Sequence, residues 1–372
     1  MPAVHLKRHI FNHKLVARLG LIILKHYPQF KFDDFKVYIG SFHDYISFSE
    51  RLNIITNALN KYMPKDFYES AKIIKKSLPE DYKTDNNWNQ FIWMPLSDFI
   101  AKNGCKKEYL EVSFALIEDI TKHFTCEFAI RPFIENFEEE SINQLTIWAT
   151  NKNPNVRRLA SEGCRPRLPW AKEIKAFKKK PYSGIELLQI LKNDDSKYVQ
   201  KSVANHMNDI AKDNPKIALK ILRQWKKENK PNTNWIVKHA LRNELKKGTP
   251  DALKIEGYSL SPKIKISNFL LSHKKIKIGD SLKFSFTITN TGPITENLLI
   301  DYICFFMKFN NKRAPKTFKI CVKKIKKGES VLIEKTHSFK LISTRKLYSG
   351  EHKIAVFING KIICEKSFEL DA

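Results

Sequence analysis

The sequence feature that most constrains the fold is an approximate repeat of one helical pattern in the N-terminal part of the chain. Residues 155–160, 198–203 and 236–241 carry copies of this pattern, spaced about 40 residues apart. Each copy places an apolar pair on one helix face, with a basic or amide pair between them. A period of about 40 residues is typical of HEAT repeats, in which stacked helix pairs bury their apolar faces against each other. We therefore predict an all-α HEAT-like repeat solenoid.

In such a stack the basic pairs would line one concave surface. The candidates for this surface are Arg157 and Arg158, Lys201, and Lys238 and Arg242. For a single helix, Lys and Arg that merely solvate the outer face would explain the pattern, but three copies in register favour a functional basic groove. The net charge of +27, from 66 Lys and Arg against 39 Asp and Glu, favours an anionic partner such as nucleic acid. A lysine-rich composition from AT-rich coding sequence is the alternative source of this charge.

The C-terminal part changes from helical to strand periodicity. Residues 1–258 have the helical pattern, the breaker-rich stretch 257–262 suits a linker, and residues 262–372 contain short alternating runs separated by turn signals. Leu282, Phe284, Phe286 and Ile288 alternate with polar residues, while the run around His352 alternates less cleanly. Several short strands over about 110 residues predict an immunoglobulin-like β-sandwich. Its turns are basic, but a sandwich by itself implies no function.

The sequence gives no sign of a metal site, a membrane span or an export signal. The six cysteines form no Cys-x-x-Cys pair, and none lies at zinc-binding spacing to a histidine. The apolar run 19–24 is far too short to span a bilayer. Residues 1–14 lack an apolar stretch followed by a cleavage site. We therefore expect a cytoplasmic protein that binds no metal and no membrane.

The most unusual segment is the loop predicted at residues 161–170, directly after the first repeat copy. Two prolines and a glycine break the helix there, and the loop carries Glu162, Arg165, Arg167 and Trp170. A structural interpretation is that Glu162 simply pairs with Arg165 or Arg157. A catalytic interpretation is that the carboxylate stabilises an oxocarbenium-like sugar, the tryptophan attracts a cationic base, and the arginines bind phosphates.

Two further acids could join Glu162. Glu127 lies in the helix pair before it, and Asp209 in the repeat after it. Because stacked repeats bring equivalent positions side by side, three acids from three layers could face one pocket. Asp209 could instead cap a helix or form a local salt bridge.

Several segments resemble one known family. Residues 124–133 and 156–170, together with 93–99 and 205–209, resemble the AlkC branch of bacterial HEAT-like-repeat alkylpurine DNA glycosylases, relatives of the AlkD branch. The predicted immunoglobulin-like domain is also similar to one that some members carry. The resemblance covers essentially the whole chain.

The resemblance implies a monofunctional enzyme that hydrolyses the N-glycosidic bond of N3-alkylated bases in double-stranded DNA and leaves an abasic site. It implies 3-methyladenine as the chief substrate, with 3-methylcytosine as a further candidate, and no metal or cofactor. Glu127, Glu162, Trp170 and Asp209 match positions that line the family's active site. The basic residues match only a general groove pattern. We expect a monomer that acts on alkylated DNA at the bacterial nucleoid, without swinging the lesion into a deep pocket.

Two rival functions remain open at the level of sequence. A non-catalytic DNA-damage or DNA-structure binder would use the same scaffold, but it would not need the acid and tryptophan of the 161–170 loop. A protein–protein adaptor would not need basic pairs in three repeats, and its binding would not weaken steeply with salt.

Overall fold

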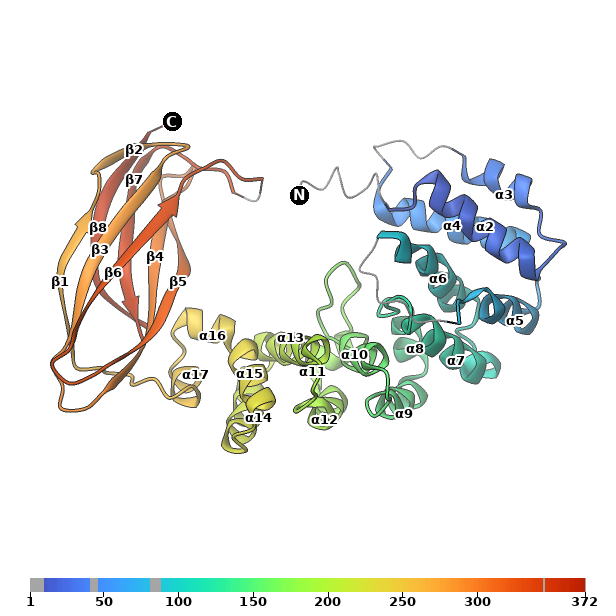
Figure 1. Cartoon of the computed structure of the whole chain (residues 1–372), viewed down its shortest axis with the longest axis horizontal. Coiled ribbons are helices and arrows are strands. Elements are labelled where there is room, and N and C mark those ends of the chain that lie inside the picture. Colours follow the sequence, from blue (N-terminus) through green and yellow to red (C-terminus); the bar gives the residue numbers. More distant parts are fainter. Residues whose placement is uncertain (1–9, 41–45, 81–87, 344, 372) are drawn as a thin grey trace. The chain divides into compact units, whose positions relative to one another are not determined.

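The computed structural model describes residues 10–40, 46–80, 88–343 and 345–371. The chain divides into two compact units, Met1–Ala218 with Asn229–Ile236, and Leu219–Glu228 with Val237–Ala372 (Figure 1). The first unit is helical, and the second contains the last helices and a β-sandwich. This confirms the predicted order of a helical repeat followed by an immunoglobulin-like domain. Residues 1–9, part of the stretch searched for an export signal, lie outside the described residues.

The described helices follow one another through the first part of the chain and share short connections. They are α2 (His13–His26), α3 (Phe32–Ile39), α4 (Phe48–Tyr62), α5 (Phe67–Ser77), η1 (Trp88–Trp93), α6 (Met94–Asn103), η2 (Lys107–Tyr109), α7 (Leu110–Thr121), α8 (Arg131–Asn136), α9 (Glu138–Trp148), α10 (Pro154–Glu162), α11 (Lys175–Lys179), α12 (Tyr182–Leu191), α13 (Lys197–Asp213), α14 (Pro215–Lys227), α15 (Pro231–Ala240), α16 (Arg242–Lys247) and α17 (Pro250–Ile255).

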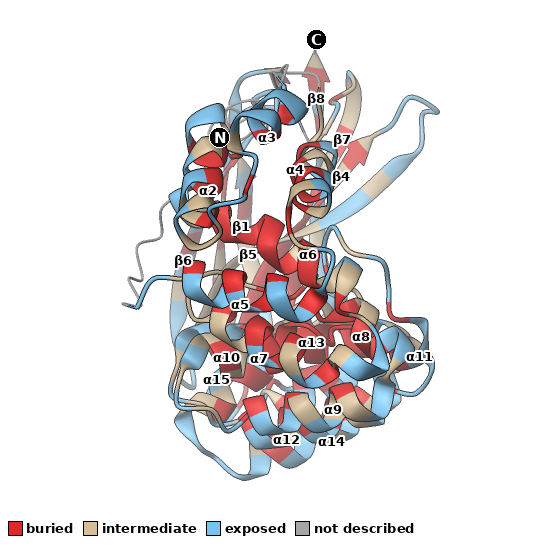
Figure 2. Ribbon diagram, turned by 90° about the vertical axis from the view of Figure 1, so that its right-hand side faces the viewer, coloured by how far each residue is buried: buried red, intermediate tan, exposed pale blue. Residues whose placement is uncertain are grey.

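The repeat pattern produces a two-row stack in the first unit. Helix α10 packs against α9, α12 and α13, so the pairs α9/α10 and α12/α13 are neighbouring layers. Val156 and Ala160 of the first copy and Val199 and Val203 of the second are fully buried, as the pattern predicts. Figure 2 shows buried residues where the helices face one another and exposed residues on the outer turns that it displays. This layering brings α10 directly beside α13.

The strands of the second unit form two sheets. They are β1 (Ile264–Leu271), β2 (Lys275–Lys277), β3 (Ser281–Asn290), β4 (Glu296–Met307), β5 (Arg313–Ile325), β6 (Ser330–Ser338), β7 (Gly350–Ile358) and β8 (Lys361–Asp371). One sheet has the order β1-β3-β6 and the other β2-β8-β7-β4-β5.

The burial of the sandwich explains both the clean and the blurred alternation in the sequence. Leu282, Phe284, Phe286 and Ile288 on β3 all point into the core. On β7, the expected positions are buried too, but Ala355 and Phe357 on the opposite face join Ile303 in a second small apolar cluster. A strand covered on both faces has no reason to alternate.

The change from helix to strand falls where the sequence predicts it, but the contacts group the last helices with the sandwich. Gly248, at the end of α16, lies so close to Gly360 in the β7–β8 turn that a Cβ atom on Gly248 would be 2.5 Å from the Gly360 Cα. Both glycines have positive φ. That one domain ends at residue 258 and the next begins at residue 262 therefore stays a prediction. Among the described residues, no helix is long and apolar enough to cross a membrane.

Asp301 in the sandwich gives a pH-dependent stability prediction. Its side chain is buried on β4, and its Oδ1 has no hydrogen-bond partner among the residues that the structure describes. Burial raises its pKa from 3.8 to about 6, although Lys319 and Lys246 oppose the shift. Between these two pH values the folded protein retains a proton that the unfolded chain releases, so this group lowers stability as the pH rises through that window. We expect Asp301→Asn to raise the free energy of unfolding by about 1–3 kcal/mol at pH 8.

Urea unfolding of Asp301→Asn and the unaltered protein at pH 4 and pH 8 tests this prediction. The gain is expected at pH 8 and should be much smaller at pH 4, where Asp301 is protonated in the folded protein and partly protonated in the unfolded chain. A gain of equal size at both pH values would show that the carboxylate charge is not its source.

Candidate active site

The loop between α10 and α11 is held at its base by a buried arginine. Arg131, at the start of α8, donates hydrogen bonds to the carbonyl oxygens of Gly163 at 3.0 Å and Arg165 at 2.9 Å, and also to that of Lys172. Within the loop, the Ile174 amide donates to the Pro166 carbonyl. Figure 1 shows the connection projecting from the helical stack. A loop is therefore present and held by hydrogen bonds, but its predicted start at residue 161 is wrong: α10 continues through Glu162, so Ser161 and Glu162 are helical and the connection begins at Gly163.

Trp170 occupies the projecting part of this loop in an unusual state. Its side chain is 88% exposed, and its backbone has φ +65°. Left-handed backbone is costly for a bulky residue, and a large aromatic group normally gains by burial. Both features together are what a side chain kept for contact with a partner would show. This placement suits the predicted role of Trp170, which remains a prediction.

Arg131 provides a test of how the loop is held. Replacing it with methionine removes three hydrogen bonds to carbonyl groups and leaves part of the loop backbone without donors. We expect a loss of about 1–3 kcal/mol in the free energy that keeps the loop closed. Hydrogen exchange of the amides in 165–174 should accelerate in Arg131→Met while exchange in the sandwich stays the same. Unchanged exchange in this segment would mean that Arg131 does not hold the loop.

The three predicted acids are linked by two arginines in what we call the acid–arginine cluster: Glu127, Arg158, Glu162, Arg165 and Asp209. Glu127 lies in the turn before α8, Arg158 and Glu162 lie on α10, Arg165 lies in the loop, and Asp209 lies on α13. The contacts follow in that order, with N···O distances of 2.8, 3.4, 2.6 and 2.7 Å. The stacked layers thus bring the three acids into one ion-pair network, and Asp209 also forms the local salt bridge that was its alternative, with Lys212 at 3.0 Å. That the three acids face one pocket stays a prediction.

Burial and charge act against each other in this cluster. Burial alone would raise the pKa of Glu162, but the guanidinium groups of Arg158 and Arg165 and the hydrogen bond from Ser202 hold that pKa below its usual value. Burial also lowers the pKa of His206 to about 3. His206 is therefore neutral at physiological pH, and its Nδ1 lies 3.0 Å from the Ser161 carbonyl oxygen. His206 is fully buried, so it packs against α10.

Glu127 differs from the other two acids in its free hydrogen-bonding capacity. Both oxygens of Glu162 and both oxygens of Asp209 accept hydrogen bonds from neighbouring side chains. Glu127 is bonded through Oε2, to Arg158. Within the part of the chain that the structure describes, no group donates to its Oε1. This oxygen can accept a hydrogen bond from a water molecule or lie against a developing positive charge.

Four of the five arginines predicted to contact DNA have carboxylate partners in the protein. Arg157 binds both oxygens of Asp194, and Arg167 binds both oxygens of Asp213. Arg158 and Arg165 belong to the acid–arginine cluster. Glu162 therefore does pair with Arg165, as the structural interpretation expects, whereas Arg157 pairs with Asp194. Contacts of these arginines with phosphate stay predictions.

The predicted lysines of the groove are exposed, but they are divided between the two units. Lys201 lies on α13 in the first unit, whereas Lys238 and Arg242 belong to the second. Arg242 donates a hydrogen bond to the His239 carbonyl. Whether these residues share one groove remains a prediction.

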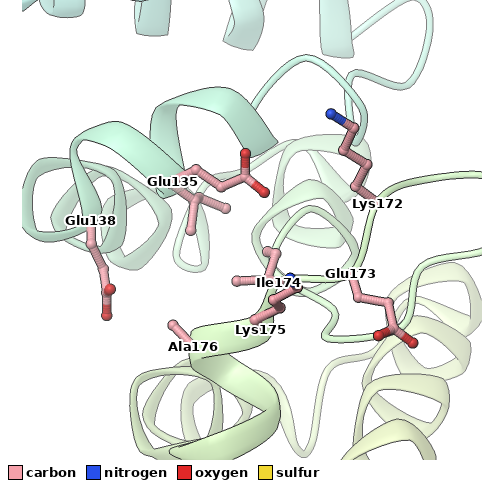
Figure 3. A pocket seen from close by; sticks show the side chains of 8 residues that line it. Glu135, Glu138, Lys172, Glu173, Ile174, Lys175 and Ala176 are labelled. Atoms are coloured by element: carbon pink, nitrogen blue, oxygen red, sulfur yellow. The ribbon is translucent and has the colours of Figure 1, made fainter.

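The neighbouring surface has a depression that does not include the predicted acids. It has a volume of about 600 Å³, and Figure 3 shows it between α8, α9 and the start of α11. Glu135 and Glu138 line one side, and Lys172, Glu173 and Lys175 come from the segment that leads into α11. In the described ranges, no three His, Cys, Asp or Glu side chains are grouped so that they could hold a metal ion.

Two residues at this site were not singled out from the sequence. Arg131 lies inside the 124–133 motif, but nothing in the sequence indicates that its side chain binds the backbone of the loop. Tyr198 directly precedes the second apolar pair, and its ring stacks on Arg158 with 4.9 Å between Cζ and the ring centroid. The repeat could have identified Tyr198 from sequence, because Tyr198 begins the second copy and the helix of this copy packs against α10.

Fold and site together define a HEAT-like-repeat protein with a carboxylate cluster in its helical part and an immunoglobulin-like domain after it. Residues 265–372 match the family described as the C-terminal Ig-like domain of the uncharacterised protein YhaZ. The chain is 35% identical to the uncharacterised protein YhaZ of Bacillus subtilis (strain 168), over 98% of this chain and 99% of YhaZ.

A solved structure covers the same extent. Pseudomonas fluorescens alkylpurine DNA glycosylase AlkC, bound to DNA containing an abasic-site analogue, is 31% identical to this chain, with a TM-score of 0.91 and 99% of both chains covered. The chain belongs to the AlkC-type family of HEAT-like-repeat alkylpurine DNA glycosylases, the family that its central motifs resemble.

Proposed function

We propose that this protein is a monofunctional DNA glycosylase that hydrolyses the N-glycosidic bond of N3-alkylated bases. The substrates proposed are 3-methyladenine and, as a further candidate, 3-methylcytosine in double-stranded DNA. The observation that carries the proposal is the acid–arginine cluster, in which ion pairs join three carboxylates and two arginines from adjacent layers, and Arg165 of this cluster belongs to the same loop as the exposed Trp170. Membership of the AlkC-type family supports it.

The chemistry requires little help from an acid at the leaving base. An N3-methylated base already carries a positive charge, so it departs as a neutral molecule with the bonding electron pair. The sugar that remains is oxocarbenium-like at C1′, and carboxylates near C1′ stabilise that charge. Water then adds to C1′, its proton is taken up by a carboxylate, and an abasic site remains.

The roles of the three acids follow from their hydrogen bonds. Glu127 orients the attacking water and accepts its proton through Oε1, the oxygen without a partner among the described residues. Glu162 and Asp209 have both oxygens engaged, so they contribute negative charge and fix the arginines. Trp170 contacts the cationic base or the sugar with the face of its ring.

We further propose that the protein acts as a monomer on nucleoid DNA in the bacterial cytoplasm, with no metal or cofactor. The net charge of +27 supports a polyanionic partner. Lys201, Lys238, Arg242 and the ion-paired arginines Arg157, Arg158, Arg165 and Arg167 are the proposed DNA-contacting residues. The arginines would bind phosphate while keeping or exchanging their carboxylate partners.

The experiment that tests this function separates cleavage from binding. DNA methylated in vitro is incubated with the protein, and abasic sites are counted as strand breaks after alkaline treatment. We expect breaks that depend on both methylation and protein, and none before alkali, since no strand cleavage accompanies hydrolysis. Salt-dependent DNA binding without any breaks would support the non-catalytic binder. A protein–DNA adduct trapped by borohydride would contradict the monofunctional assignment.

A further inference from the structure

Tyr198 lies at the start of α13, where the second repeat layer meets α10. Its ring stacks on the guanidinium group of Arg158, 4.9 Å from Cζ to the ring centroid. The residue is nevertheless 46% exposed. An aromatic side chain that remains half exposed beside a buried ion-pair network is placed there by its contact with the cation rather than by core packing.

The ring of Tyr198 contacts the guanidinium of Arg158, which forms ion pairs with two acids. Its NH1 donates to Glu127 Oε2 at 2.8 Å, and its NH2 lies 3.4 Å from Glu162 Oε1. NH1 also donates to Thr125 Oγ1, so the polar contacts hold the guanidinium along its edge, and the ring of Tyr198 adds a contact on its face. Without the contact on its face, the guanidinium could rotate out of this plane toward Glu127 Oε1, the oxygen proposed to bind water.

A similar contact between a cation and an aromatic ring occurs in the next layer of the stack. Lys197 lies over the ring of Trp235 at 5.2 Å, and its amino group donates to Gln200. A cation on one helix thus stacks on an aromatic residue of the following layer in both places. At Arg158, in contrast to Lys197, the stacked cation also bridges two acids of the proposed active site.

We propose that Tyr198 is a positioning residue of the active site, whose ring holds the Arg158 guanidinium between Glu127 and Glu162 and so keeps Glu127 Oε1 open. This inference rests on the proposed glycosylase function. Tyr198 touches no acid oxygen in the structure, so it acts through Arg158. The ring, rather than the hydroxyl group, performs the role.

Three variants test the proposal in single-turnover kinetics with excess protein. Tyr198→Leu removes the ring, Tyr198→Phe keeps the ring without the hydroxyl, and Tyr182→Leu removes another exposed tyrosine, from α12. We expect Tyr198→Leu to lower the rate of base release about tenfold with little change in DNA affinity. Tyr198→Phe should retain most of the rate, and Tyr182→Leu should match the unaltered protein.

The pH profile distinguishes positioning from a structural role. The carboxylate of Glu162 is faced by Arg158 and Arg165, by Ser202 and the neutral His206 on α13, and by Glu127 beyond Arg158. If Arg158 leaves its place, the pKa of Glu162 rises. The acid limb of the rate profile should therefore move to higher pH in Tyr198→Leu and stay in place in Tyr182→Leu. A merely structural loss would lower the rate without moving this limb.

A measurement independent of activity keeps the inference separate from the proposed function. In nuclear magnetic resonance spectra, the Arg158 guanidinium signal should be shifted by the ring current of Tyr198, retained in Tyr198→Phe and lost in Tyr198→Leu. If the protein releases no base but this pattern holds, the proposed function fails and the stacking stands without a catalytic role. An unshifted signal, an unmoved acid limb in Tyr198→Leu, or an equal loss in Tyr198→Phe and Tyr198→Leu would overturn the proposal.

Discussion

Replacing Glu127 by glutamine is expected to lower the rate of base release by about 10²–10⁴-fold. The amide has nearly the same shape, but it carries no negative charge and cannot accept the proton of the attacking water. Its carbonyl oxygen can still accept the hydrogen bond from Arg158, so the cluster should remain folded. The measurement is single-turnover release of base from methylated duplex DNA, together with DNA affinity by fluorescence anisotropy, which should change little.

Glu135→Gln is the matched control for this prediction. Glu135 is an exposed glutamate on the neighbouring helix α8 and has no contact with the acid–arginine cluster. It undergoes the same chemical change, and its rate should equal that of the unaltered protein. If Glu127→Gln kept nearly full activity while Asp209→Asn abolished it, the water-orienting role would belong to Asp209 instead.

Replacing Arg165 by methionine is expected to destabilise the protein by about 3–5 kcal/mol. Arg165 is buried and bridges Glu162 and Asp209, with N···O distances of 2.6 and 2.7 Å. Its loss leaves two buried acids without their shared cation. The pKa of Glu162 should then rise, so the folded state would hold a proton that the unfolded chain releases, and the destabilisation should grow as the pH increases.

Arg167→Met provides the control, since Arg167 also pairs with acids but its side chain is 33% exposed. An ion pair screened by water contributes little, so this variant should lose no more than about 1 kcal/mol. Urea unfolding followed by circular dichroism at pH 5 and pH 8 compares the two. Equal losses in both variants would mean that burial of the cluster does not govern its energetics.

The fold was largely predictable because its signals are local. The apolar pairs of the repeats and the alternation on β3 depend on residues only a few positions apart, and both are buried as expected. The meeting of Glu127, Glu162 and Asp209 was predictable for a related reason, since a repeat period carries one layer's position onto the next.

The partners of the arginines were not predictable, because they depend on residues far along the chain. Arg157 finds Asp194 at a separation of 37 residues, and Arg167 finds Asp213 at 46. From sequence, an arginine that binds phosphate and an arginine that binds a distant aspartate look alike. The same limit applies to Arg131, whose three acceptors are backbone carbonyls and have no sequence signature at all.

The central claim is most directly tested by identifying the product. Genomic DNA treated with a methylating agent is incubated with the protein and with Glu162→Gln, and the released bases are separated by chromatography. The account predicts that the unaltered protein releases 3-methyladenine and that Glu162→Gln releases little, because the negative charge beside the departing base is gone. Release of no methylated base by the unaltered protein, while it binds DNA, would contradict the account.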